Sequence, residues 1–359
     1  MIDNTFLDNT QKSILPHLKI TELLVASALA KETGKKCNVE IIAMPDLGLA
    51  NNSIRMCGGF FTGMFMHWDA DIPFVPVDAT VNSCGVSVFS LKEGISFQEF
   101  ISRINTAKEK IGQLGYNWNF ERGNHFISLC RNELNQYFIV MHASADEYKK
   151  SVPGRSLYPI PNVWYYDDIK VITTKNSERY LRYLVGDPAK KFTSIAIDLE
   201  RINKERMHSV ATIIARELIK EEVCYIPHYG MPTESSIAIG CSWKTDKSVL
   251  LSLPGKDVFI IERGDKSLDR WLTPHGFGAE IISPSIFYKN GKLYINGSQI
   301  LYDNDVDLLK EKAIRHVRSD NRQIEDYINR ILQKVNARVI SKLHPIMMIN
   351  KDGYAVYKE

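Results

Sequence analysis

The sequence predicts an α+β protein in which a single domain spans residues 1–359. Helical and extended patterns alternate irregularly along the chain, without the regular strand–helix order of a parallel α/β fold. We find no internal repeat, low-complexity tract or Pro/Gly-rich linker that would divide the chain. A chain of 359 residues that is 44% hydrophobic and 24% charged can bury a sizeable core.

Four segments show helical patterns. Residues 20–34, ITELLVASALAKETG, read as a helix that is closed by Gly34. Ser96 and Glu99 form a capping-box pattern before a second helix, and Gly115 ends it. A third helix is expected at about 203–221. The apolar positions of the second helix are Phe100, Ile101, Ile104, Ile111 and Leu114, and those of a C-terminal helix are Ile324, Tyr327, Ile328, Ile331, Leu332 and Val335.

Extended patterns lie between these helices. Residues 36–44 (KCNVEIIAM), 137–142 (YFIVMH) and 337–343 (ARVISKL) predict strands. Asn290-Gly291 stands between the runs IFYK and KLYIN, which predicts a type I′ hairpin because both turn residues tolerate positive φ.

Charge and cysteine content point to a cytoplasmic protein. The net charge of +3, from 45 basic and 42 acidic residues, neither requires nor excludes nucleic acid. The N-terminal MIDNTFLDNTQKS lacks the layout of a signal peptide, and no run of about 18 apolar residues predicts a membrane span. The six cysteines form no CxxC pair, which favours a reducing compartment over a disulfide framework.

Four side chains are candidate metal ligands. Cys84 lies in NSCGVSVF, His125 in RGNHFISL, His142 at the end of YFIVMH and His228 in IPHYGMP. Each is near a strand end or a glycine turn, where side chains can converge on a cleft. Thiolate and imidazole suit a borderline transition metal. The alternative for each position is a hydrogen-bonded structural histidine or a buried structural cysteine.

His275 is a candidate nucleophile. The segment TPHGFG sets it beside Gly276 and Gly278, whose backbone N–H groups can approach a phosphate closely. A neutral imidazole can attack phosphorus and form a phosphoramidate, which is covalent catalysis. The alternative is a glycine turn that carries an incidental histidine.

Read in chain order, eight short segments resemble the motifs of the RtcB-type RNA ligase family. They span residues 41 to 352 and follow the family's order: IIAMPDLG, NSCGV, GNHFISL, VMHAS, PHYGM, LSLPGKD, TPHGFG and HPIMMINKDG. The resemblance implies a single α+β domain with mixed sheets around a central metal-binding cleft.

The resemblance also implies ligands and cofactors. Cys84, His125 and His142 match the ligands of one Mn²⁺, and Cys84 with His228 matches part of a second site. Zn²⁺ or another divalent transition metal would suit the same donors. His275 matches the histidine that takes GMP from GTP. The positions that match or suit GTP contacts are Asn124, His275, Gly276, Gly278 and Lys351.

The activity implied by the resemblance is RNA ligation. The family joins RNA ends that carry a 2′,3′-cyclic phosphate or 3′-phosphate to 5′-hydroxyl ends, and it activates the 3′-phosphate with GMP. The expected partners are therefore GTP and an RNA with such ends, with no membrane.

Several positions depart from the family pattern. Val81 replaces an Asp, Ser128 a Glu, Tyr229 an Asn and Ala279 an Arg, and the basic HRKG segment has no clear match. Asp78 could replace the lost Asp only if its loop is reshaped. Two alternatives therefore stay open. One is a metal-dependent phosphoesterase or nucleotide hydrolase on the same scaffold, and the other is a catalytically silent RNA- or nucleotide-binding relative.

Overall fold

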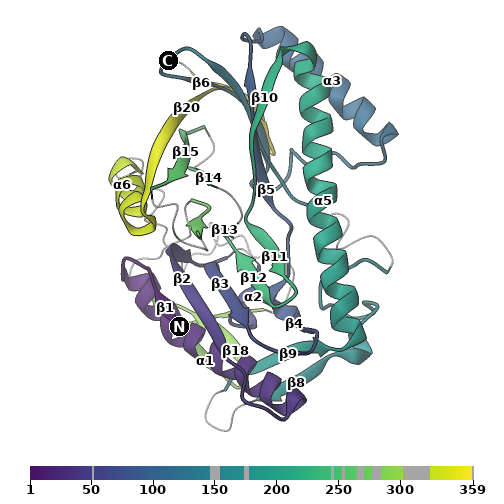
Figure 1. The fold of residues 1–359 in the computed structure, drawn as a ribbon, viewed down its shortest axis with the longest axis vertical. Helices are drawn as coiled ribbons and strands as arrows, with labels where there is room; N and C mark the ends of the chain where they lie inside the picture. The colour runs from purple at the N-terminus through teal and green to yellow at the C-terminus, as the bar shows by residue number, and fades with distance from the viewer. Residues whose placement is uncertain are drawn as a thin grey trace.

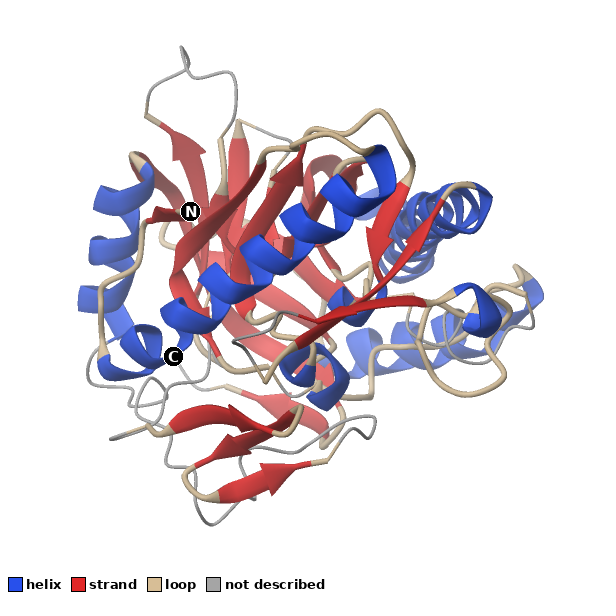
Figure 2. Ribbon diagram, turned by 90° about the horizontal axis from the view of Figure 1, so that it is seen from below, coloured by secondary structure: helices blue, strands red, loops and turns tan. Residues whose placement is uncertain are grey.

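The computed structural model describes residues 1–50, 52–145, 154–173, 178–243, 246–252, 255–264, 271–276, 284–301 and 324–357. Strands occupy the centre, and helices lie at the periphery (Figure 2). The predicted α+β class is confirmed, because the described residues form several largely antiparallel sheets together with long helices.

The largest sheet has eight strands. Its path is β10 (Ile219–Pro227), β5 (Gly85–Leu91), β7 (Tyr137–Ala143), β6 (Phe126–Asn132), β20 (Ala337–Asn350), β15 (Val258–Arg263) and β14 (Lys247–Leu250), with β21 (Gly353–Val356) paired to β20. The end strands β10 and β14 also contact each other, so the sheet curves into a nearly closed barrel.

Alternating side chains give this sheet two apolar faces. The inner face packs a core that includes Val86, Val140 and Ile260. The outer face packs against helices through residues such as Met141 and Ile349. Burial on both faces explains why the predicted strand 137–142 reads as a continuous apolar run.

A five-stranded sheet lies next to the barrel end (Figure 1). Its order is β1 (Ile2–Asp3), β2 (Val39–Gly48), β3 (Thr62–Trp68), β12 (Ser236–Ile239) and β11 (Tyr229–Thr233). Only a single residue separates β10 from β11, so the chain passes directly from the barrel to this sheet at His228.

The other strands of the described residues form three smaller sheets. They are β13 (Cys241–Ser242) with β16 (Thr273–Pro274), β17 (Ile286–Lys289) with β18 (Lys292–Ile295) and β19 (Ser298–Ile300), and β4 (Phe74–Pro76) with β9 (Tyr180–Val185) and β8 (Lys170–Thr173). The predicted hairpin is confirmed between β17 and β18. Asn290 and Gly291 both have positive φ, at 52° and 71°.

Among the described residues, the α-helices are α1 (Asn9–Thr33), α2 (Ser53–Cys57), α3 (Phe97–Gln113), α5 (Asp187–Ala215) and α6 (Ile324–Val335). The predicted helix at 20–34 is confirmed, with Gly34 as its left-handed cap, but it begins earlier because Asp8 and Gln11 form a capping box. The oxygen of Ser96 caps α3 by accepting a hydrogen bond from the backbone N–H of Glu99. The predicted C-terminal helix is also confirmed.

The prediction of a helix at about 203–221 is wrong at both ends. The helix α5 begins at Asp187 and stops at Ala215, where Arg216 takes a left-handed φ of 51°. Residues 219–221 belong to strand β10, because the segment pairs with β5 along the barrel. Tertiary pairing therefore overrides the helical pattern. Figure 1 shows α5 running beside the barrel and on toward β8 and β9.

Among the described residues, α1 is long and apolar enough to cross a membrane by length and composition. The core helix of a soluble protein passes the same test. The buried face of α1 packs on the core through residues such as Leu18, Val25 and Leu29.

A candidate metal centre beside a histidine–aspartate pair

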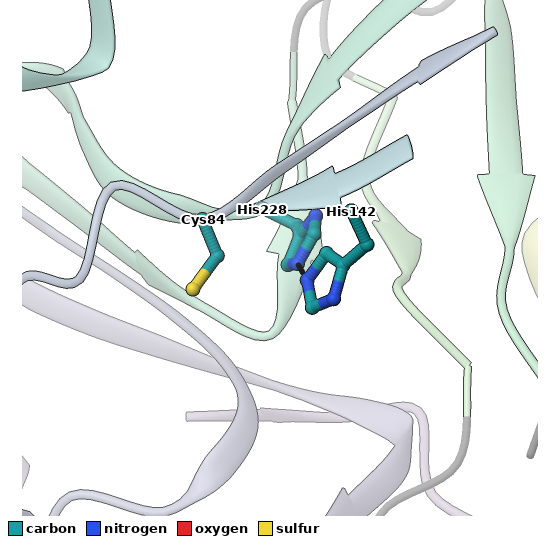
Figure 3. Close-up of side chains that lie close together, drawn as sticks. All are labelled: Cys84, His142 and His228. Atoms are coloured by element: carbon teal, nitrogen blue, oxygen red, sulfur yellow. Dashed lines mark hydrogen bonds between the residues drawn. The ribbon is translucent and has the colours of Figure 1, made fainter. Parts of the chain in front are cut away.

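Three predicted ligands meet where the barrel joins the five-stranded sheet. Cys84 directly precedes β5, His142 is near the end of β7, and His228 follows β10. All three are buried, and their ligand atoms lie within 4.8 Å of one another. The pairing of β5 with both β7 and β10 brings these strand ends together. Figure 3 shows the three side chains projecting into one region.

The hydrogen bonds of the two imidazoles favour a cation between them. Nδ1 of His142 lies 3.0 Å from the carbonyl oxygen of Asn124, and Nδ1 of His228 lies 3.4 Å from that of Ile226. A carbonyl only accepts, so each Nδ1 carries the hydrogen and each Nε2 presents a lone pair. The two Nε2 atoms are 3.2 Å apart. Two nitrogens on one tetrahedral zinc ion are about 3.3 Å apart.

Burial keeps these imidazoles neutral. Desolvation lowers the pKa of His142 to about 4 and the pKa of His228 well below its usual value. Neutral imidazole is the form that binds metals. Together with the Cys84 sulfur, the donor set fits a borderline divalent transition metal.

His125 lies beside this group but outside the three residues that share the 4.8 Å limit. Its ring stands edge-on to His142, with centroids 5.4 Å apart. Its Nδ1 is 2.7 Å from Oδ1 of Asn119. Nε2 is therefore the nitrogen that is available to a metal ion. The role of His125 as a ligand stays a prediction.

The ring of His275 lies next to that of His228, with centroids 5.4 Å apart. Its Nδ1 lies 2.8 Å from Oδ2 of Asp46, a fully buried residue of β2. The carboxylate fixes Nδ1 as the donor and leaves Nε2 with a lone pair. Asp46 lies in the segment IIAMPDLG, and no role was predicted for it. The signal was an acidic residue at the end of a buried strand.

Gly276 is required by this arrangement. Its φ is 146°, and a Cβ at this position would lie 2.0 Å from the carbonyl oxygen of Leu251. Its N–H donates to the same Asp46 oxygen at 3.3 Å. The backbone after His275 is therefore fixed by a backbone contact and by a carboxylate.

Tyr229 lies next to both His228 and His275, and Arg55 contacts its ring. The Tyr229 ring lies 5.5 Å from His228 and 5.8 Å from His275, centroid to centroid. Burial raises the pKa of Tyr229 to about 12, so its hydroxyl stays protonated near neutral pH. The Arg55 guanidinium lies 4.8 Å from the same ring and donates to the carbonyls of Ala79 and Thr80.

The other residues predicted to contact GTP lie in three different settings. Asn124 supplies the carbonyl that orients His142. Lys351 lies in an exposed turn between β20 and β21. Gly278 and Ala279 lie outside the described residues.

The residues at and near the positions that depart from the family pattern have other surroundings and partners. Val81 is buried and apolar, so it offers no ligand. Asp78 pairs with Arg182 at 2.5 Å. The Ser128 hydroxyl donates to the carbonyl of Met347 inside the sheet.

No protein-family model matches the chain, and no curated protein sequence matches it.

Proposed function

We propose that this protein is a metal- and GTP-dependent RNA ligase that forms a covalent GMP–histidine intermediate on His275. The observation that carries the proposal is the position of this imidazole. It is adjacent to His228 of the Cys84/His142/His228 group, and Asp46 orients it through Nδ1. An imidazole that a carboxylate orients beside a group of candidate metal ligands is suited to nucleotidyl transfer.

The proposed steps use the lone pair of His275 Nε2. This nitrogen attacks the α-phosphorus of GTP, an N–P bond forms, and the bond to pyrophosphate breaks. The hydrogen on Nδ1 stays in its hydrogen bond to Asp46, and the carboxylate of Asp46 stabilises the positive charge that develops on the ring. The GMP then passes to an RNA 3′-phosphate. A 5′-hydroxyl displaces it, which forms the phosphodiester and releases GMP.

Cys84, His142 and His228 would hold a divalent cation, Mn²⁺ or Zn²⁺. When bound, this cation would neutralise charge on the phosphates. Their burial and neutral imidazoles support this assignment. GTP and RNA would be the partners. A cytoplasmic location accords with cysteines that form no disulfide.

Labelling of the full chain with α-³²P-GTP tests the proposal, with Mn²⁺, Zn²⁺ and Co²⁺ supplied separately. We expect label on the wild-type protein that is lost in His275→Ala. His208→Ala is the matched control, because His208 is exposed on α5 and away from the donors. RNA with 3′-phosphate and 5′-hydroxyl ends should then be joined. Folded protein that takes no label with any of the three metals would overturn the proposal.

A second function is favoured by one feature of the same site. Cys84, His142 and His228 by themselves would leave a coordination position for water, as in catalytic zinc sites. A phosphoesterase or nucleotide hydrolase would use that position. Release of product from a phosphodiester without GTP, together with loss of that activity in Cys84→Ser, would select this alternative.

A further inference from the structure

A buried asparagine on α5 contacts the backbone beside two of the candidate ligands. Nδ2 of Asn203 lies 3.0 Å from the carbonyl oxygen of Ser83 and 2.9 Å from that of Ala143. Ser83 immediately precedes Cys84, and Ala143 immediately follows His142. One amide group therefore holds together the two chain segments that carry the thiol and one imidazole.

Arg206 fixes the orientation of this amide. One turn along α5, its Nη2 lies 2.7 Å from Oδ1 of Asn203. The guanidinium can only donate, so the asparagine oxygen faces it and both amide hydrogens face the two carbonyls. Both side chains are fully buried.

The same network reaches His125. Arg206 and the amide nitrogen of Asn119 both donate to the carbonyl of Ser144. Oδ1 of Asn119 in turn accepts from Nδ1 of His125 at 2.7 Å. The polar face of α5 is thus connected to three of the four predicted ligands.

The segment before Cys84 has a backbone that needs such support. Thr80 and Ser83 both have left-handed φ angles, 40° and 53°, although neither is glycine. This conformation is unfavourable for residues other than glycine. The hydrogen bond from Asn203 to Ser83 stabilises the conformation that directs the Cys84 sulfur toward His142 and His228.

We infer that Asn203 is a positioning residue of the metal centre, setting the distance between the Cys84 thiol and the His142 imidazole through the Ser83 and Ala143 carbonyls. The inference rests on the proposed function, because both require a cation bound by Cys84, His142 and His228. Outer residues of this kind change metal affinity about 10- to 100-fold when they are replaced.

Co²⁺ titration of the full chain tests this inference, since a thiolate–cobalt band reports the Cys84 contact. Asn203→Leu removes both donors at similar volume, and we expect Co²⁺ affinity to fall about 10- to 100-fold with a weaker band. Val210→Ala is the matched control. It removes buried volume from the same helix, so it should lower stability and leave Co²⁺ affinity unchanged.

The outcomes separate the two proposals. Wild-type affinity in folded Asn203→Leu, with affinity lost in Cys84→Ser, would overturn the positioning role and leave the metal centre standing. Failure of the wild-type protein to bind Co²⁺ would overturn the metal centre itself. If circular dichroism shows that Asn203→Leu does not fold, Asn203→Ser takes its place. Wild-type affinity in Asn203→Ser would overturn the positioning role in the same way.

Discussion

The carboxylate of Asp46 lies 2.8 Å from Nδ1 of His275, although 229 positions separate them in the chain. Asp46 lies where the pairing of β2 with β3 shifts register between Ala43 and Gly48. Irregular pairing of this kind often redirects a side chain next to a functional site. Here the side chain points to the imidazole of the proposed nucleophile.

Asp46→Asn should slow GMP transfer to His275. An amide can donate to Nδ1 as well as accept from it, so the tautomer with a lone pair on Nε2 is no longer favoured. The rate of labelling by GTP should fall on the order of 10²-fold or more, measured in single-turnover experiments. Metal content should stay at the wild-type level, because Asp46 is not among the three clustered donors. An unchanged labelling rate would contradict the assigned role.

Cys84→Ser should remove bound metal. The thiolate is a strong ligand for borderline cations, and a serine hydroxyl is a poor replacement. Mass-spectrometric metal analysis after gel filtration should show the content fall from about one cation per chain to near zero. Cys37→Ser is the control, since Cys37 is partly exposed and lies outside the donor group. Equal metal in both variants would place the cation elsewhere.

Gly276→Ala should disrupt the site, whereas Gly112→Ala should not. The new methyl group at position 276 would collide with the Leu251 carbonyl, and its backbone would be strained at φ 146°. We expect lost GTP labelling and a lower unfolding temperature. A Cβ at Gly112, inside α3, meets no atom within 4 Å, so that variant should be up to about 1 kcal/mol more stable. Wild-type labelling by Gly276→Ala would refute the requirement for glycine.

His17 should make stability depend on pH. Burial lowers its pKa below the ordinary value near 6.5. Below that value the unfolded chain binds a proton that the folded protein does not. Stability therefore rises with pH across this window and is lost as pH falls from 6.5 toward the folded pKa.

Urea unfolding at about pH 5 and about pH 7 measures this effect. The wild-type protein should lose more stability between the two than His17→Phe, which retains an aromatic ring beside Tyr288. Equal losses would show that His17 does not contribute.

Local patterns predicted some elements well. The Ser96 cap, the Gly115 stop and the Asn290-Gly291 turn each depend on a few neighbouring residues, and the structure has all three. The boundary between α5 and β10 was predicted wrongly, because pairing with β5 decides it and that partner is more than a hundred residues earlier.

The sequence by itself determined the donor types, since Cys84, His142, His228 and His275 stand out from their local settings. Tertiary structure decided which of them meet. The strand pairing brings the first three together, and β2 and α5 supply Asp46 and Asn203. Asp46 lies in the quoted segment IIAMPDLG but was given no predicted role, and Asn203 has no distinctive neighbours in sequence. Their importance arises from hydrogen bonds made across the fold, and only the packed strands and helix create those distances.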